Sequence, residues 1–160
     1  GYRLRYFIRS GAQRLGCVLL AGAAKAIAAR ERWIGRDERA RLCNLPRVIN
    51  NSRFLIFPHV RVPHLASHAL GQLARQVVAD WQRQWGFSPL LMETFVDPRR
   101  YAGTCYRAAG WELLGQSSGR GLARPGKSYQ STPRLVLTKP LDSNFRRLLC
   151  AAPLPGRGMQ

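Results

Sequence analysis

Apolar residues recur along the chain at two spacings, which predict strands and helices. The stretches LRYFIRS and LGCVLLAGA, joined by a short loop at Gly11, are typical of a β-hairpin. Between residues 64 and 85, apolar side chains repeat every four positions from Leu65 to Trp85, which is the stripe of an amphipathic helix. Gly86 follows the stripe and is well placed to end this helix. The pattern therefore predicts a hairpin first and a long helix near the middle of the chain.

The segment between the hairpin and the long helix predicts two short helices and a strand. An Ala-rich run over 23–34 is typical of a helix that Gly35 can end, and Asp37 or a neighbour can begin a second short helix. The Asn-Asn-Ser sequence at 50–52 is a turn signal. The apolar run 54–62 after it predicts a strand.

Prolines and glycines divide the rest of the pattern. Pro58 fits a bulge or edge position of the predicted strand, and Pro63 fits the first turn of the long helix. After the long helix we expect a strand over 89–96, a short helix over 99–109 and a strand over 111–114.

The last part of the chain contains a loop signal, a strand and a tail. The Gly/Ser/Pro-rich stretch 116–133 predicts a loop, RLVLTKPL after it a final strand, and residues 151–160 a disordered tail. Because the chain begins with Gly1 rather than Met, we expect a piece of a longer protein, with a single domain over 1–150. A strand, a helix and a neighbouring strand in succession imply a right-handed crossover, and hence a mixed sheet in an α+β domain.

Charge sets this chain apart from an ordinary globular domain. The 160 residues carry 26 Lys and Arg against 8 Asp and Glu, a net charge of +18. Residues 1–61 hold 13 basic against 3 acidic residues and 118–160 hold 8 against 1, whereas 62–117 hold 5 against 4. Basic flanks around a nearly neutral centre favour contact with nucleic acid. Coding bias would explain the use of Arg instead of Lys, but not the shortage of acids.

Other kinds of site find less support in the sequence. The four cysteines lie far apart without a C-x-x-C pair, as expected of reduced thiols in a cytoplasmic protein. His64 and His68 are four residues apart, but the glutamate of an H-E-x-x-H motif and a third ligand are missing, so we expect no metal site. No apolar run reaches about 18 residues, so we expect no membrane span.

The order of elements over 53–115 and the segment YRAAGW at 106–111 resemble the GCN5-related N-acetyltransferase fold. The resemblance implies a mixed, mostly antiparallel sheet with helices on both faces and acetyl-CoA as the cofactor. In that family the tyrosine of this motif can act as general acid toward the coenzyme A thiolate, which makes Tyr106 the candidate acid. The alternative is that Tyr106 and Trp111 only pack the short helix onto the sheet.

The loop that enters the long helix departs from that family. The family has a glycine-rich turn whose backbone N–H groups hold the cofactor's pyrophosphate. This chain has VPHLASH at 62–68 instead. His64, Ser67 and His68 are the candidate phosphate contacts, whereas Pro63 removes one donor. The departure weakens the expectation that acetyl-CoA binds.

Glu93 is an acidic residue within the apolar run LLMETFV, and it shares a strand face with Asp97. It is the candidate general base of an acyltransferase. The alternative is a buried ion pair with Arg53 or Arg61, which a chain so rich in arginine favours.

A second resemblance covers nearly the whole chain. The stretches RERWIG, NNSRFLIFPHVRVPHLASHAL, ETFVDPRRYAGTCYRAAGW and LGQSSGRG look like the signature of the Druantia anti-phage defence component A family. The resemblance implies a role in bacterial defence or beside transposases, with other defence-system or transposase proteins as partners. The final strand, RLVLTKPL, departs from the family's pattern.

Together these features favour an acetyltransferase-like domain that contacts nucleic acid and has lost acyl transfer. The alternatives are an active acyl-CoA-dependent N-acyltransferase and an interaction module anchored by tryptophans. An open cleft ending at Tyr106 would favour a ligand, whereas one filled by His64 or Arg61 would favour a fold without activity. The expected nucleic-acid contacts are Arg53, Arg61, Arg99, Arg100, Arg120, Arg124, Asn50 and Asn51.

Overall fold

The strands of the protein form one mixed sheet. A computed structural model describes residues 1–117 and 133–151. The six strands lie in the order β1-β2-β3-β4-β6-β5, and every pair is antiparallel except β3–β4, which is parallel. This confirms the predicted α+β class and mostly antiparallel sheet. The strands are β1 (Arg3–Ser10), β2 (Gln13–Gly22), β3 (Val48–Ile56), β4 (Leu91–Val96), β5 (Glu112–Gln116) and β6 (Leu135–Pro140).

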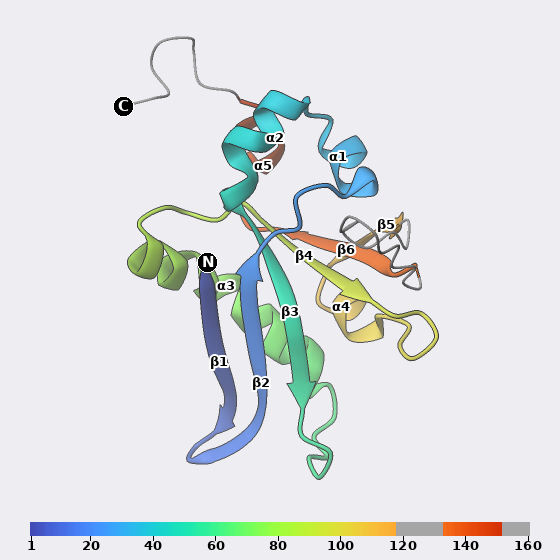
Figure 1. Cartoon of the computed structure of the whole chain (residues 1–160). Coiled ribbons are helices and arrows are strands. Elements are labelled where there is room, and N and C mark those ends of the chain that lie inside the picture. Colours follow the sequence, from blue (N-terminus) through green and yellow to red (C-terminus); the bar gives the residue numbers. More distant parts are fainter. Residues whose placement is uncertain (118–132, 152–160) are drawn as a thin grey trace, which may run out of the picture.

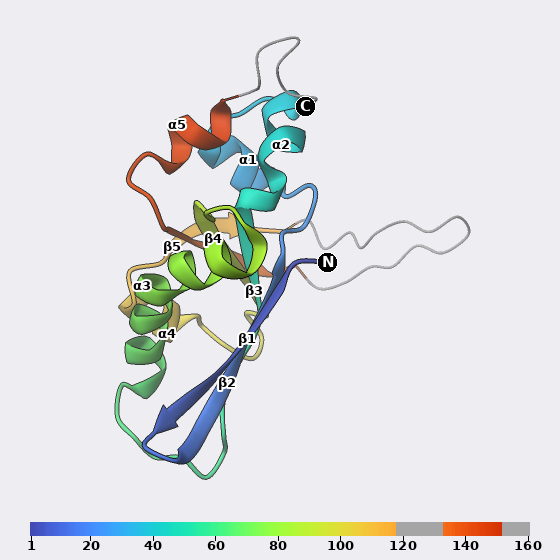
Figure 2. The ribbon, with the colours of Figure 1, turned by 90° about the vertical axis from the view of Figure 1, so that its left-hand side faces the viewer.

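Helices pack on both faces of this sheet. They are α1 (Ala28–Ile34), α2 (Glu38–Asn44), α3 (Leu65–Trp85), α4 (Thr104–Ala108) and α5 (Phe145–Cys150), with a 3-10 turn, η1 (Leu45–Arg47), before β3. Figure 2 shows α3 along one side of the sheet, while α1, α2 and α5 gather at the end where β3 and β4 begin. None of the helices in the described ranges is long and apolar enough to cross a membrane.

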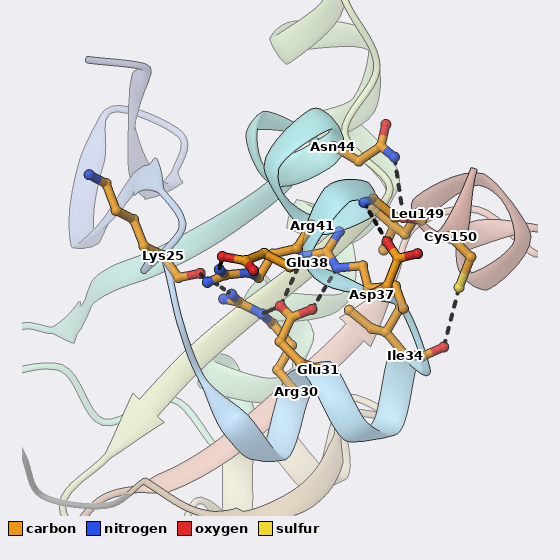
Figure 3. Close-up of polar contacts among 12 residues, drawn as sticks. Lys25, Arg30, Glu31, Ile34, Asp37, Glu38, Arg41, Asn44, Leu149 and Cys150 are labelled. Carbon is orange, nitrogen blue, oxygen red and sulfur yellow. Dashed lines mark hydrogen bonds and ion pairs between the residues drawn. The ribbon is translucent and has the colours of Figure 1, made fainter. Parts of the chain in front are cut away.

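Two hydrophobic cores correspond to the two faces. The apolar stripe of α3 packs on Ile49 and Met92, while α1 and α5 pack on Val48 and Leu91. Because successive residues of a strand point to opposite faces, these two cores lie on opposite sides of the sheet. Figure 3 shows contacts among the helices on the α1 and α5 side of the sheet. One of them joins Asn44 Nδ2, which donates, to the Leu149 carbonyl at 3.2 Å.

The helix ends confirm several predictions. Gly35 and Gly86 have left-handed φ values of 80° and 85°, and their N–H groups donate to the Glu31 and Gln82 carbonyls. The side chain of Asp37 accepts a hydrogen bond from the Ala40 N–H at 2.8 Å, and so caps α2. These signals act within a single turn, which is why the sequence alone reveals them.

Several predicted boundaries were wrong. The strand placed at 54–62 is β3, which begins at Val48 and ends at Ile56, so the supposed turn at 50–52 lies inside it. Pairing with strands on both sides outweighs the turn preference of asparagine there. Pro63 precedes α3, which begins at Leu65.

The short helix expected over 99–109 covers only Thr104–Ala108. The Arg100 and Tyr101 N–H groups instead close a turn on the Asp97 carbonyl, at 3.1 and 2.9 Å. The predicted disordered tail over 151–160 lies outside the described residues except for Ala151, and so does most of the predicted loop over 116–133.

The pairing of β3 with β4 is short. Only 48–50 of β3 pair with 91–93 of β4, after which the strands diverge (Figure 1). On its other edge β3 carries a bulge at Ser52, because Leu19 pairs with Arg53 and Leu20 with Asn51. The divergence leaves space between two neighbouring strands, and the bulge turns Ser52 and Arg53 toward the same face.

Candidate functional site

A cleft opens where β3 and β4 diverge. Its volume is about 840 Å³, and its walls come from 51–56, 94–97, 100–106, Ala66 and Arg134. Both faces of the sheet contribute, so the cleft passes between the strands. Such a volume is typical of sites for small molecules and cofactors.

Tyr106, the candidate general acid, lies in the wall of this cleft. Its hydroxyl is 2.6 Å from Asn51 Oδ1, while Asn51 Nδ2 donates to the Leu19 and Arg53 carbonyls at 3.1 and 3.0 Å. These two donated bonds fix the amide orientation, so Oδ1 faces the phenol and the phenol must donate to it. Burial raises the pKa of Tyr106 to about 12, so the hydroxyl stays protonated at neutral pH. Its proton is therefore committed to Asn51.

Tyr106 also has the packing role that the alternative assigned to it. Its ring meets Trp111 edge to face, with centroids 4.9 Å apart. Both side chains belong to the core beneath α3. The two interpretations of the motif therefore describe different parts of one side chain.

Glu93 is fully buried at the closed end of the strand pair and forms an ion pair with Arg30 of α1. Asn50 Nδ2 donates to its other oxygen at 3.2 Å. The ion-pair interpretation is correct, but the partner is Arg30 instead of Arg53 or Arg61. Burial raises the pKa of Glu93 against the opposing effect of the guanidinium, as would suit a general base. The carboxylate, however, lines no part of the cleft.

The two asparagines predicted as nucleic-acid contacts face the protein interior. Asn50 is 9% exposed and Asn51 is 3% exposed, and their amides bond to Glu93 and Tyr106. The hydroxyl of Thr94 donates to the Asn51 carbonyl at 3.0 Å. The two asparagines therefore brace the region between the diverging strands.

The predicted phosphate contacts lie at the start of α3. His64 has a left-handed φ of 58°, and its carbonyl accepts from the Ser67 hydroxyl at 3.2 Å and from the His68 N–H at 3.1 Å. Within the described residues, Ala66 is the only part of this turn that lines the cleft, so His64, Ser67 and His68 are outside its wall. In the same ranges no group of three His, Cys, Asp or Glu residues is placed to hold a metal ion.

The predicted arginines divide into three groups. Arg53 and Arg100 line the cleft. Arg99 pairs with Asp97, and Arg61 donates to the Val60 carbonyl. Arg120 and Arg124 lie outside the described residues.

Two further cleft residues were missed by sequence analysis. Arg134 comes just before β6, and Tyr101, with 69% of its surface exposed, lies in the loop before α4. Nothing in their local sequence distinguishes them, because only the sheet order brings them to the cleft.

A basic surface lies on the face of β1, β2 and β3 that is turned away from α3. We call this face the outer face. None of the labelled helices covers it in Figure 1, where α3 lies behind these strands, so in the described part of the chain the outer face has no helix over it. The register places Arg5, Leu19 and Arg53 in one row across the outer face. A hollow of about 220 Å³, lined in part by Arg3, Arg5 and Ser52, adjoins that row.

The outer face carries positive charge without compensation. None of the three strands contains Asp or Glu, and no ion pair within the described residues involves its arginines. Phe7 is 49% exposed there, with the guanidinium of Arg14 4.1 Å from its ring centroid. The arginines of the outer face are Arg3, Arg5, Arg9, Arg14 and Arg53.

Solved structures of N-acetyltransferases share this fold. Spermidine N-acetyltransferase from Vibrio cholerae, in complex with CoA and spermine, matches with a TM-score of 0.53 and 11% identity over 87% of this chain and 66% of that one. An acetyltransferase of the GNAT family from Streptococcus pneumoniae matches with a TM-score of 0.50 and 12% identity, over 86% and 67%. Phosphinothricin acetyltransferase from Sinorhizobium meliloti, in complex with AcCoA, gives 0.50 and 14%, over 93% and 64%.

The chain therefore has the fold of the GNAT acetyltransferases and spans about two thirds of the length of these structures. It belongs to the Druantia protein DruA family, whose family model matches residues 1–146. Both resemblances seen in the sequence are confirmed. No curated protein matches the sequence.

Proposed function

We propose that this domain binds nucleic acid through the outer face of β1–β3, within the defence or transposon-associated role that its family implies. The observation that carries the proposal is a set of five arginines on a sheet face that no helix of the described ranges covers and whose three strands contain no acidic residue. Such a surface attracts the phosphates of nucleic acid with little sequence discrimination.

The spacing of the arginines suits a nucleic-acid backbone. Arg3 and Arg5 are two residues apart on one strand, which is about 6.6 Å. Two nucleotides of a DNA strand advance by a similar distance, about 3.4 Å each. The exposed Phe7 and Leu55 between the charges offer apolar contacts for sugars and bases.

Acyl transfer is not part of the proposed function. The Tyr106 proton is donated to Asn51, and the Glu93 carboxylate is held by Arg30. The loop between β3 and α3 contains no glycine with which to hold a pyrophosphate. Each of the three groups that the reaction would need is therefore engaged elsewhere or altered.

The test is the salt dependence of DNA binding, measured by fluorescence anisotropy with a labelled duplex of 20 base pairs. We expect the Arg3→Gln/Arg5→Gln double variant to reduce the slope of log K against log salt by about 2, near 0.9 per phosphate contact. The matched control is Arg75→Gln/Arg83→Gln on α3, which should leave the slope unchanged. Absence of binding at low salt, or equal losses in both variants, would overturn the proposal.

One observation favours an acyltransferase as a second candidate. The cleft is open, and it reaches both Tyr106 and Ala66 in the first turn of α3. Titration calorimetry with acetyl-CoA tests this candidate. Binding at micromolar concentration, lost on Tyr106→Phe substitution, would support it, and no heat at millimolar concentration would end it.

A further inference from the structure

The cleft between β3 and β4 adjoins the outer face. Ser52 lines both the hollow on that face and the cleft, and Arg53 belongs to both the arginine row and the cleft wall. The bulge in β3 at Ser52 is what turns these two neighbours in the same direction. A nucleic-acid strand that crosses the outer face therefore reaches the cleft while it remains on a basic surface.

The charge at the cleft is positive. Arg53, Arg100 and Arg134 line it, and all three are exposed. Among the described residues that line it, Asp97 is the one acid, and it accepts hydrogen bonds from the backbone and side chain of Arg99. None of these three arginines has an ion-pair partner among residues 1–117 and 133–151, so the cleft presents their guanidinium groups to an anion.

The walls combine this charge with aromatic surface. Phe54 and Phe95 come from the two diverging strands, and Tyr101, which is 69% exposed, lines the cleft from the loop before α4. Arginines that hold phosphates beside aromatic rings that stack on bases are the two elements of a single-strand site. The volume of about 840 Å³ is enough for a nucleotide but not for a duplex.

We propose that the cleft holds an unpaired nucleotide of a single strand whose backbone lies on the outer face. Arg53, Arg100 and Arg134 contact its phosphates, and the base stacks on Tyr101. A base within a duplex cannot enter, because it would first have to leave its stack. This inference rests on the proposed function and adds to it a preference for single-stranded or frayed nucleic acid.

The experiment compares single-stranded and duplex 20-base oligonucleotides in anisotropy titrations of the chain and three variants. Tyr101→Ala and Arg100→Gln alter the cleft at exposed positions, and Arg3→Gln/Arg5→Gln alters the outer face. We expect the Tyr101 substitution to weaken single-strand binding roughly tenfold and to leave duplex binding unchanged. The outer-face variant should weaken both. Circular dichroism checks that each variant is folded.

The two proposals fail in different ways. If both cleft variants bind single strands as the parent does while the outer-face variant is weakened, the cleft inference is overturned and the proposed function stands. If the outer-face variant also binds normally, the proposed function is overturned. Acetyl-CoA that binds more tightly than the oligonucleotide, and loses affinity on Tyr101→Ala substitution, would assign the cleft to a cofactor and overturn the inference. Failure of acetyl-CoA to displace the oligonucleotide supports it.

Discussion

The strands β3 and β4 pair over three residues and then separate. Charged side chains are buried and paired in the closed half of this strand pair, and they are exposed in the open half, where the cleft lies. In the closed half, over 48–50 and 91–93, no residue is more than 9% exposed, and Glu93 is bonded to Arg30 and Asn50. In the open half, Arg53 and Arg100 are exposed and without ion-pair partners among the described residues.

This contrast shows how one arginine-rich sequence forms both a buried core and an exposed site. A buried charge must be paired, because an uncompensated one is strongly destabilising. An exposed arginine needs no partner and remains available to an external anion. Where the two strands pair, the chain has an acidic residue, Glu93. Where they diverge, it has almost no acidic residues.

The closed half should be sensitive to loss of its carboxylate. Glu93→Gln removes the fully buried carboxylate from Arg30 and leaves it with Glu31, 2.9 Å from its Nε. We therefore expect a loss of about 3 kcal/mol in the free energy of unfolding, at the lower end for a broken buried pair. Urea denaturation followed by circular dichroism measures it. The Arg30→Met/Glu93→Leu double variant removes both charges and should lose much less. A loss below about 1 kcal/mol in the single variant would show that the pair does not hold the strands together.

At the boundary between the halves, the Tyr106 hydroxyl should contribute to stability. Tyr106→Phe leaves Asn51 Oδ1 buried without a donor, and we expect a loss of about 1–3 kcal/mol in thermal or urea unfolding. Tyr101→Phe, which removes an exposed hydroxyl from the open half, is the matched control and should change nothing. Equal stability of the two variants would mean that the Tyr106–Asn51 bond is not formed in solution.

The ion pairs of Glu31, beside the closed half, should make the free energy of unfolding depend on pH. Glu31 accepts from Arg36 Nε at 2.6 Å and from Arg30 Nε at 2.9 Å. Burial alone would raise the pKa of Glu31, but these hydrogen bonds outweigh it, so the pKa is lowered. The stabilisation is therefore complete above the unfolded value of about 4.3 and is lost as pH falls through the lowered folded pKa.

The Glu31→Gln variant measures this contribution. It should cost about 1 kcal/mol at pH 7. Its difference from the parent should shrink in urea titrations below about pH 4. A difference that is constant from pH 7 to pH 3 would contradict the linkage.

The smallest effect is expected at the first turn of α3, beside the open half. His64 has a left-handed backbone, which costs a residue with a side chain about 1–2 kcal/mol, whereas glycine loses about 0.5–1 kcal/mol through its greater freedom in the unfolded chain. His64→Gly should therefore stabilise by a few tenths to about 1 kcal/mol. His64→Ala keeps the strain and should not. Equal effects of glycine and alanine on the melting temperature would rule out backbone strain as the cause.

Particular residues show why some of this molecule could be predicted and some could not. The stripe of α3 and the glycines at 35 and 86 were correctly interpreted, because apolar periodicity and helix caps act within a few residues. The Asn-Asn-Ser sequence at 50–52 was misinterpreted as a turn, because its place inside β3 depends on strands that begin at residues 13 and 91. Arg30, the true partner of Glu93, is 63 residues away in the sequence, so no local pattern connects the two.

The sequence by itself therefore determined the elements whose signals are local, the fold class that their order allows, the excess of arginine, and the family to which the chain belongs. The tertiary structure decided which charges are buried and which are free. It paired Glu93 with Arg30, turned the Tyr106 proton toward Asn51, and assembled the cleft from segments as distant as Arg53, Tyr101 and Arg134. The physical reason is that pairing and burial depend on distances across the sheet, and these are set by strand order instead of by separation along the chain.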